Sequence, residues 1–102
     1  MLSNKGGDVN LCNKNGESPL YIASYNGHKD CVDFLLKNGA EVNKCTNEGF
    51  SLIYAASEKG HISILEMLSN KGGDVNLCNK NGESPVYIAS YNGHKECVDF
   101  LL

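Results

Sequence analysis

The chain has no arginine and no tryptophan, and only two prolines among its 102 residues. Its formal net charge is −3, and its lysines are scattered. It therefore lacks the clustered cations that neutralise nucleic-acid phosphates or meet anionic lipid headgroups, and we expect neither a nucleic-acid nor a membrane partner. No apolar run is long enough for a signal peptide or a membrane span. We accordingly expect an intracellular, cytoplasmic protein.

The sequence contains one segment twice. Residues 1–36 match residues 67–102 at 34 of 36 positions, and only the pairs Leu20/Val86 and Asp30/Glu96 differ. A shift of 33 residues aligns a third, more divergent copy in the middle, with "SLIYAAS" under "SPLYIAS" and Gly60 under Gly27. Self-similarity at a fixed period is typical of a stacked array rather than of one closed globule.

Each unit predicts two short helices. Asn15-Gly16 and Asn81-Gly82 are turn dipeptides, because both residue types tolerate a positive φ. Ser18 can cap a first helix that ends near Gly27. A second helix stops near Asn38-Gly39 and carries an apolar stripe made of Cys31, Val32, Phe34, Leu35 and Leu36. Helices this short need burial against neighbouring units to be stable.

The period of 33 together with "SPLYIA", "GH", "CVDFLL" and "GAEVN" resembles the ankyrin repeat. The resemblance implies an all-α solenoid of helix-turn-helix units with short hairpin-like connecting turns. In the phase of that family, residues 1–12 are the tail of a preceding repeat, 13–45 and 46–78 are repeats, and 79–102 is a repeat cut off after its second helix.

Two departures from the family pattern are visible. Tyr21, Tyr54 and Tyr87 stand where the family usually has histidine, so the local hydrogen bonds must differ. Leu52 replaces the proline of the middle repeat, which removes a preset φ in the first helical turn. We expect this to weaken the middle repeat, and Leu52→Pro to raise stability by about 0.5–1 kcal/mol through the unfolded state.

The recurring cysteines and histidines do not predict a disulfide, a metal site or a catalytic site. Cys12, Cys45 and Cys78 are spaced by 33 residues, and neighbouring stacked helices lie about 8–10 Å apart, which is too far for a disulfide or a zinc thiolate site. We expect the cysteines to be buried small hydrophobes. The three histidines after the glycines lack a converging nucleophile and are expected to bond backbone groups or to cap the second helix. We therefore expect no metal, no cofactor and no enzymatic activity in this segment; a catalytic domain elsewhere is neither supported nor excluded.

The resemblance to ankyrin repeats implies a non-catalytic protein-interaction scaffold whose partner lies on the concave surface of turn tips and first helices. Tyr25, Phe50 and Tyr91 are the expected anchors, since large aromatic contacts dominate interface energy. The positions carried over from the family are Lys14, Asn15, Glu17, Tyr25 and Asn26 in the first repeat, Asn47, Glu48, Phe50, Glu58 and Lys59 in the second, and Lys80, Asn81, Glu83, Tyr91 and Asn92 in the third.

The alternative is a structural spacer, or a self-stacking array without a specific partner, because near-identical copies need no site diversity. The chain starts with Met1-Leu2 at positions equivalent to a helix, and it ends on Phe100-Leu101-Leu102. Because solenoids usually carry polar terminal units, we expect a segment of a longer array. We also expect head-to-tail self-association through these uncapped apolar ends.

Overall fold

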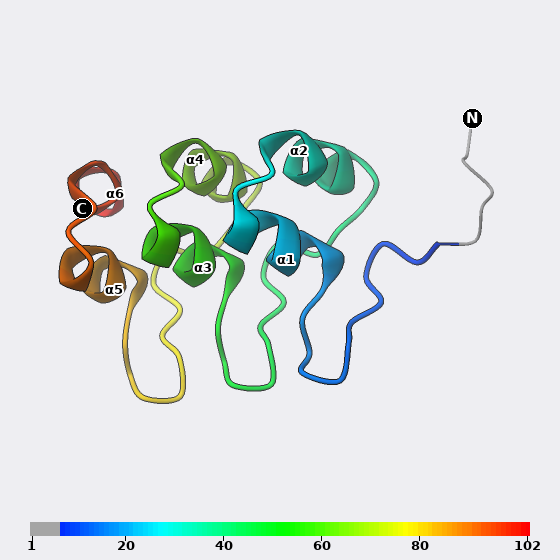
Figure 1. Cartoon of the computed structure of the whole chain (residues 1–102), viewed down its shortest axis with the longest axis horizontal. Helices are drawn as coiled ribbons and strands as arrows, with labels where there is room; N and C mark the ends of the chain where they lie inside the picture. The colour runs from blue at the N-terminus through cyan, green and yellow to red at the C-terminus, as the bar shows by residue number, and fades with distance from the viewer. Residues whose placement is uncertain (1–6) are drawn as a thin grey trace.

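Six short helices stack in pairs in the computed structural model, which describes residues 7–102. They are α1 (Pro19–Asn26), α2 (Lys29–Lys37), α3 (Leu52–Lys59), α4 (Ile62–Asn70), α5 (Pro85–Tyr91) and α6 (Lys95–Leu101). Figure 1 shows α1, α3 and α5 in one row and α2, α4 and α6 in a second row above it, with long loops extending below the first row. The predicted all-helical solenoid is confirmed. One helix pair falls within each predicted repeat, whereas the repeat boundaries remain a prediction.

The start of each first helix is set by a serine. The Oγ atoms of Ser18, Ser51 and Ser84 accept hydrogen bonds from the backbone N–H three residues later, at 3.0, 2.9 and 3.1 Å. This satisfies one of the backbone donors that a helix N-terminus leaves free. The cap predicted for Ser18 is therefore present, and Ser51 and Ser84 cap the first helices of the other two repeats in the same way.

The first helix of the first repeat ends at Gly27, as predicted. Gly27 has φ of 78°, a left-handed conformation that residues with a Cβ adopt at a cost. A Cβ at this position would also lie 2.7 Å from the ring of His61. The glycine therefore both turns the chain and leaves room for the next repeat.

The loops below the first helices are hairpin-like turns. The backbone N–H groups of Asn13, Thr46 and Asn79 donate to carbonyls four residues later, at 3.1, 2.9 and 3.0 Å. Gly16 and Gly82 have φ of 78° and 80°, as expected for the second residue of the turn dipeptides. The turns carry polar side chains to the outer edge of the array.

Asparagine side chains connect the tail of one repeat to the tail of the next. The amide of Asn10 donates to the carbonyl of Gly39 at 3.3 Å, and its oxygen accepts from the N–H of Glu41 at 2.9 Å. Asn43 repeats both bonds with Gly72 and Asp74, at 3.1 and 2.8 Å. These side chains satisfy backbone groups that otherwise have no partner in a helix or sheet.

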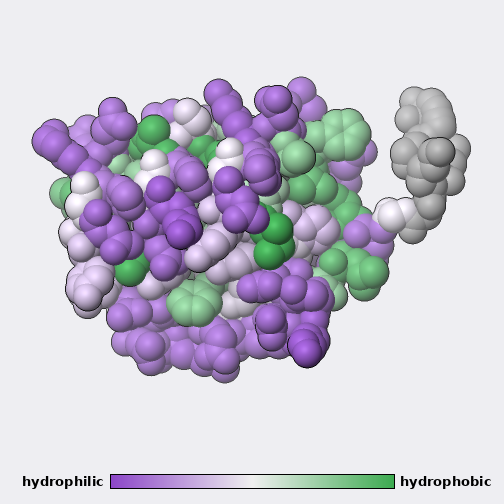
Figure 2. Space-filling view, viewed as in Figure 1, coloured by the Kyte–Doolittle hydropathy of each residue, from purple (hydrophilic) through white to green (hydrophobic). Residues whose placement is uncertain are grey.

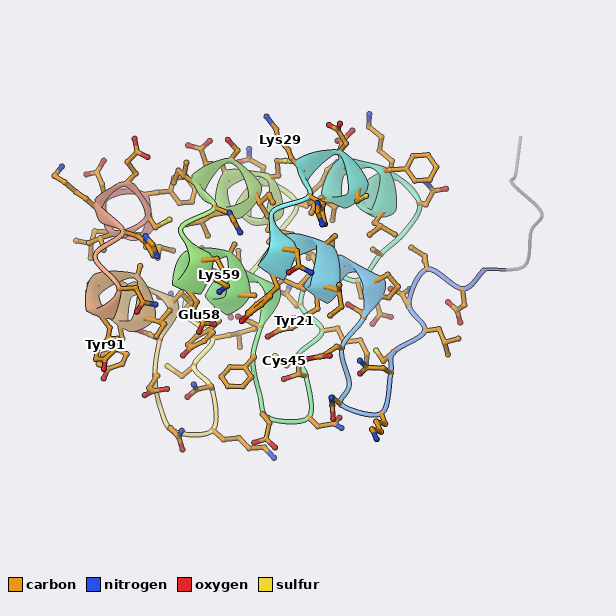
Figure 3. All side chains as sticks on the ribbon, in the orientation of Figure 1. Tyr21, Lys29, Cys45, Glu58, Lys59 and Tyr91 are labelled. Carbon is orange, nitrogen blue, oxygen red and sulfur yellow. The ribbon has the colours of Figure 1, made fainter. Side chains whose placement is uncertain are left out.

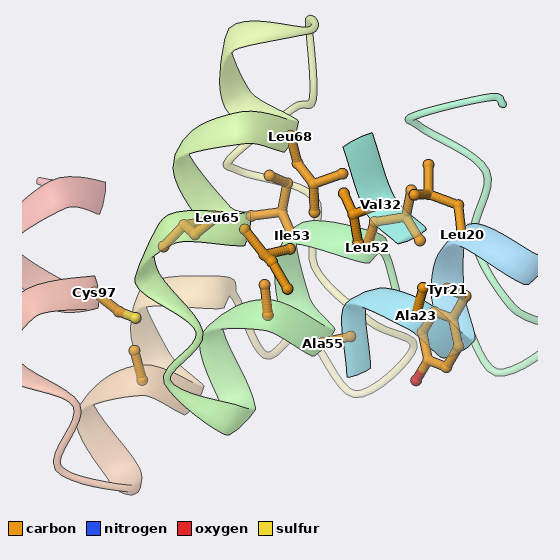
Figure 4. Packing of buried hydrophobic residues seen from close by; sticks show 13 residues of the cluster. Leu20, Tyr21, Ala23, Val32, Leu52, Ile53, Ala55, Leu65, Leu68 and Cys97 are labelled. Carbon is orange, nitrogen blue, oxygen red and sulfur yellow. The ribbon is translucent and has the colours of Figure 1, made fainter. Parts of the chain in front are cut away.

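The hydrophobic core runs along the stack instead of forming one centre. It is a continuous cluster of mainly small and branched side chains between the two rows of helices (Figure 4). Leu20 and Val32 from the first repeat and Leu52, Leu65 and Leu68 from the second are completely buried. Since each helix pair contributes to the same strip, the middle repeat is buried from both sides.

The full burial of Leu52 leads us to expect the opposite sign for the effect of Leu52→Pro, which stays a prediction. Its side chain has no exposed surface and lies in the core cluster. Replacing it with proline removes buried apolar volume, which outweighs a gain of about 0.5–1 kcal/mol in the unfolded state. The absence of proline does not mark the middle repeat as the weakest one.

The prediction that the cysteines are buried is wrong for most of them. All five are free thiols, but only Cys97 is buried; Cys12 and Cys45 are partly exposed, and Cys31 and Cys78 are exposed. Burial raises the pKa of Cys97 and of Cys45. Apart from Asp30 in place of Glu96, Cys31 has the same local sequence as Cys97, so its exposure follows from the lack of a described neighbouring repeat against that side of α2.

The predicted apolar stripe of the second helix is also only partly buried. Val32 is fully buried and Leu35 and Leu36 are partly buried, but the side chain of Phe34 is 67% exposed. Nothing in the described residues covers this ring. At the other end of the chain Leu102 is 90% exposed, while the start of the chain at Met1-Leu2 lies outside the described residues.

The histidines bond to the backbone of the preceding repeat and do not cap the second helices. Nε2 of His61 lies 3.1 Å from the carbonyl oxygen of Tyr25, and Nε2 of His94 lies 2.9 Å from that of Glu58. A carbonyl oxygen only accepts, so Nε2 carries the proton in both rings. No side-chain cap bond is made by His28, His61 or His94.

Candidate partner-binding groove

A hollow of about 700 Å³ lies between the hairpin-like turns and the row of first helices. Side chains from all three repeats line it: Asn15, Glu17, Tyr21, Ile22, Tyr25, Asn26, Thr46, Asn47, Glu48, Phe50, Tyr54, Glu58 and Glu83. We call this hollow the groove. In Figure 2, hydrophobic residues are exposed between surrounding hydrophilic ones on the same face.

Two aromatic pairs form part of the groove wall. The rings of Tyr21 and Tyr25, one turn apart on α1, are stacked with centroids 6.2 Å apart. Phe50 precedes α3 and meets Tyr54 at 5.1 Å with the rings tilted by 38°. The four-residue spacing brings the two tyrosines to one side of α1, whereas Phe50 reaches Tyr54 from the extended segment before the Ser51 cap. They supply large, rigid apolar surface beside polar groups.

Four glutamates add negative charge to the groove: Glu17, Glu48, Glu58 and Glu83. Among the described residues the only salt bridge joins Asp33 and Lys37 on α2, so none of these four carboxylates has an ion-pair partner there. Glu17 and Glu83 accept hydrogen bonds from the side chains of Asn13 and Asn79, each at 2.8 Å. These bonds orient the carboxylates without neutralising their charge.

Within residues 7–102, the one cation that lies over an aromatic ring of the groove belongs to Lys59. Its ammonium lies 4.8 Å from the centroid of the Tyr25 ring, within the range of a cation–π interaction. Figure 3 shows Lys59 next to Glu58 at the end of α3. Lys59 itself is not a lining residue, so the groove presents its carboxylates without a lysine among them.

The tyrosine hydroxyls report the same negative environment. Burial, followed by the charges of Glu17 and Glu58, raises the pKa of Tyr21 to about 12. Burial, followed by the charges of Glu83 and Glu58, raises the pKa of Tyr54 to about 12. Both effects favour the neutral phenol, because a phenolate would be poorly solvated and repelled by the carboxylates.

Nine of the fifteen predicted partner-binding residues line the groove: Asn15, Glu17, Tyr25, Asn26, Asn47, Glu48, Phe50, Glu58 and Glu83. The other six do not: Lys14, Lys59, Lys80, Asn81, Tyr91 and Asn92. Tyr91, expected to be an anchor, is 76% exposed at the end of α5. Whether any of the fifteen binds a partner stays a prediction.

Two of the predicted residues have structural roles. The side-chain amide of Asn47 donates to the carbonyl of Lys14 at 2.8 Å, and that of Asn92 donates to the carbonyl of Glu58 at 3.1 Å. Both bonds join one repeat to the one before it. Substituting either asparagine therefore tests the stack as much as any binding.

Sequence reasoning missed four lining residues: Tyr21, Ile22, Thr46 and Tyr54. The two tyrosines occupy the position of the family's histidine and were interpreted only as a change in local hydrogen bonding. The available signal for Tyr21 was the four-residue spacing to Tyr25, which places both rings on one side of the helix. Tyr21 and Tyr54 are only 7% and 4% exposed, so they form the floor of the groove.

Residues 7–102 show no sign of the other kinds of site considered in the sequence. No cluster of three or more histidine, cysteine, aspartate or glutamate side chains that could hold a metal ion is found there. Within the same range, none of the helices combines the length and the apolar character needed to cross a bilayer. The groove is thus the feature to which the partner-binding prediction applies.

Stacked helix pairs, serine caps and histidines bonded across repeats are all in place, and a family model described as "Ankyrin repeats (3 copies)" matches residues 1–78 and 52–102. The chain belongs to the ankyrin-repeat family. The two matches together span its whole length. Ankyrin repeats generally act in protein–protein interaction and are typically non-catalytic, and no catalytic family matches this chain. No curated protein matches the sequence.

Proposed function

We propose that this ankyrin-repeat chain is a non-catalytic scaffold that binds a segment of a partner protein in the groove. The observation that carries the proposal is the groove itself, since it combines concave shape, two aromatic pairs and ordered polar groups. Binding sites are usually concave and largely apolar with a few placed polar groups. Tyr25 and Phe50 are the anchors, because both line the groove and keep part of their surface exposed.

Affinity capture from a cell lysate tests the proposal. The immobilised chain is compared with a Tyr25→Ala/Phe50→Ala variant and with Tyr91→Ala, whose side chain lies outside the groove. A captured protein should be lost with the double variant, by about 2 kcal/mol or more in affinity, and kept with Tyr91→Ala. Equal capture by all three chains would contradict binding in the groove. Circular dichroism checks that each variant is folded.

The spacer alternative rests on the exposed end faces. Ile22 and Cys31 are exposed on the side of the first repeat away from α3 and α4, and Tyr87 is exposed on the far side of α5. Stacking of two chains through these faces is the predicted head-to-tail association. Sedimentation velocity over a range of concentrations tests it: growth of the particle with concentration supports stacking, and a constant monomer contradicts it.

A further inference from the structure

The charge of the groove restricts the chemistry of its partner. Glu17, Glu48, Glu58 and Glu83 converge on it from three repeats, and no lysine lies among its lining residues. None of these carboxylates takes part in a salt bridge within residues 7–102. Unbalanced charges of one sign across an interface favour a partner of the opposite sign and disfavour one of the same sign.

A second observation points to the same ligand. The side chain of Tyr21 is more than nine-tenths buried, yet it lines the groove, and no hydrogen bond found among the described residues involves its hydroxyl. In Figure 4 this hydroxyl points away from the hydrophobic cluster. Among residues 7–102, Ser24 Oγ is the one fully buried side-chain oxygen without a hydrogen-bond partner, so the Tyr21 oxygen is reachable from the groove and free to accept from a donor that enters there.

The aromatic rings already hold one cation. The Lys59 ammonium lies over the Tyr25 ring at 4.8 Å. The neighbouring rings of Phe50 and Tyr54 have no such cation among the described residues, although they stand beside Glu58 and Glu83 in the same wall. A ring face next to a carboxylate attracts a cation both through its quadrupole and through the charge.

We infer that the groove binds an extended segment of a partner protein that inserts a lysine or arginine side chain between the aromatic pairs and the glutamates. The inference rests on the proposed function and adds the partner's chemistry. The cation contacts Phe50 and the carboxylates of Glu58 and Glu83. The Tyr21 hydroxyl accepts a hydrogen bond from the segment. Lys59 sits at the edge and repels the incoming charge, which limits the affinity.

Selection from a phage library of random linear peptides, followed by binding titrations with the enriched peptides, tests the inference. Enriched peptides should contain lysine or arginine, and replacing that residue with alanine should abolish binding. A Glu58→Gln/Glu83→Gln chain should bind about tenfold more weakly, because the charged contacts are lost while the shape is kept. The matched control is Glu66→Gln/Glu96→Gln, which removes the same charge from the exposed faces of α4 and α6 and should change binding by less than about twofold.

The substitution Lys59→Met tests the same inference through an expected gain in affinity. Removing the competing cation should tighten binding of the basic peptides about two- to fivefold, in line with an exposed cation–π contact and one like-charge repulsion. Unchanged or weaker binding would overturn the role given to Lys59. Thermal unfolding of every variant separates loss of binding from loss of folding.

The outcomes distinguish the two proposals. Basic peptides that lose binding with Glu58→Gln/Glu83→Gln support both. If neutral or acidic peptides are enriched and lose binding with Phe50→Ala, the inference of a basic side chain is wrong, while the proposal of a scaffold that binds in the groove is supported. Peptides whose binding is unaffected by Tyr25→Ala and Phe50→Ala, or no enriched peptides at all, overturn both.

Discussion

The first and third repeats have almost the same sequence and bury opposite sides. Ile22 is 41% exposed, whereas its counterpart Ile88 is 9% exposed; Tyr21 is 7% exposed, whereas its counterpart Tyr87 is 48% exposed. The middle repeat covers one side of each. Burial in this molecule is therefore decided by the neighbouring repeat and not by the local sequence, as expected for a stack in which each unit contacts only its neighbours.

The reactivity of Cys31 and Cys97 should show the largest difference. Cys31 is exposed and Cys97 is only 1% exposed, and burial raises the pKa of the Cys97 thiol. We expect alkylation of native Cys97 to be at least about tenfold slower, because the thiol must first become accessible through local opening. Peptide mass spectrometry of a timed alkylation measures both rates in one sample.

Equal rates in urea serve as the control for that experiment, since unfolding removes the difference in burial. Equal rates in the native protein would break the comparison between the two repeats. Faster reaction at Cys97 would show that its side of α6 does not pack against the middle repeat.

The same substitution at Ile88 and Ile22 should have unequal costs. Ile88→Ala removes a buried side chain and should lower the free energy of unfolding by about 2–4 kcal/mol. Ile22→Ala, in the same local sequence, should cost about 1 kcal/mol, since much of its surface is already in contact with water. Urea unfolding monitored by circular dichroism measures both. A difference below 0.5 kcal/mol, about the error of such measurements, would contradict the assignment of burial to the neighbour.

Two histidines at equivalent positions of the first and third repeats should also differ in their contribution to stability, by a smaller amount. His94→Ala removes a 2.9 Å bond to the Glu58 carbonyl and should destabilise by about 1–2 kcal/mol. His28→Ala should cost less than about 0.5 kcal/mol, because that side chain is exposed. The same urea experiment applies, and a larger loss at His28 than at His94 would reverse the interpretation.

Alkaline pH should lower the stability of the first and middle repeats, which carry Tyr21 and Tyr54, and we expect this to be the smallest of the four effects. The pKa of Tyr21 and of Tyr54 is raised from 10.0 to about 12 in the folded chain. A raised acid pKa stabilises the fold fully below pH 10, and this stabilisation is lost as pH rises from about 10 to 12. Urea unfolding across that range should show falling stability, with a shallower fall in Tyr21→Phe. Tyrosinate absorbance of the chain in urea gives the unfolded reference.

The local features of the fold were predictable because their causes are local. Ser18 caps α1 through a bond to a residue three positions away, and Gly27 ends it through its own φ. The exposure of Cys31 and Phe34 was not predictable, because it depends on what lies against α2 and not on the residues of α2. The period predicted the stack but not which faces it leaves open.

The sequence predicted part of the groove lining but not all of it. Turn-tip and helix-end positions carried over from the ankyrin family include Phe50 and Glu58, which line it. They also include Tyr91, which lies outside it. The floor tyrosines were missed because they stand at the family's histidine position in the first helix, where only a change in local hydrogen bonding was expected. Depth depends on how adjacent repeats tilt and pack, and no spacing rule within one repeat gives that.

The asparagine bonds between successive tails have a mechanical consequence. Asn10 and Asn43 each span one junction and no more. Loss of the hydrogen bonds at one junction thus affects the two units that it joins, while the other junction keeps its own hydrogen bonds. The end units, which have one junction each, should therefore open at lower denaturant concentration than the middle unit, which has two.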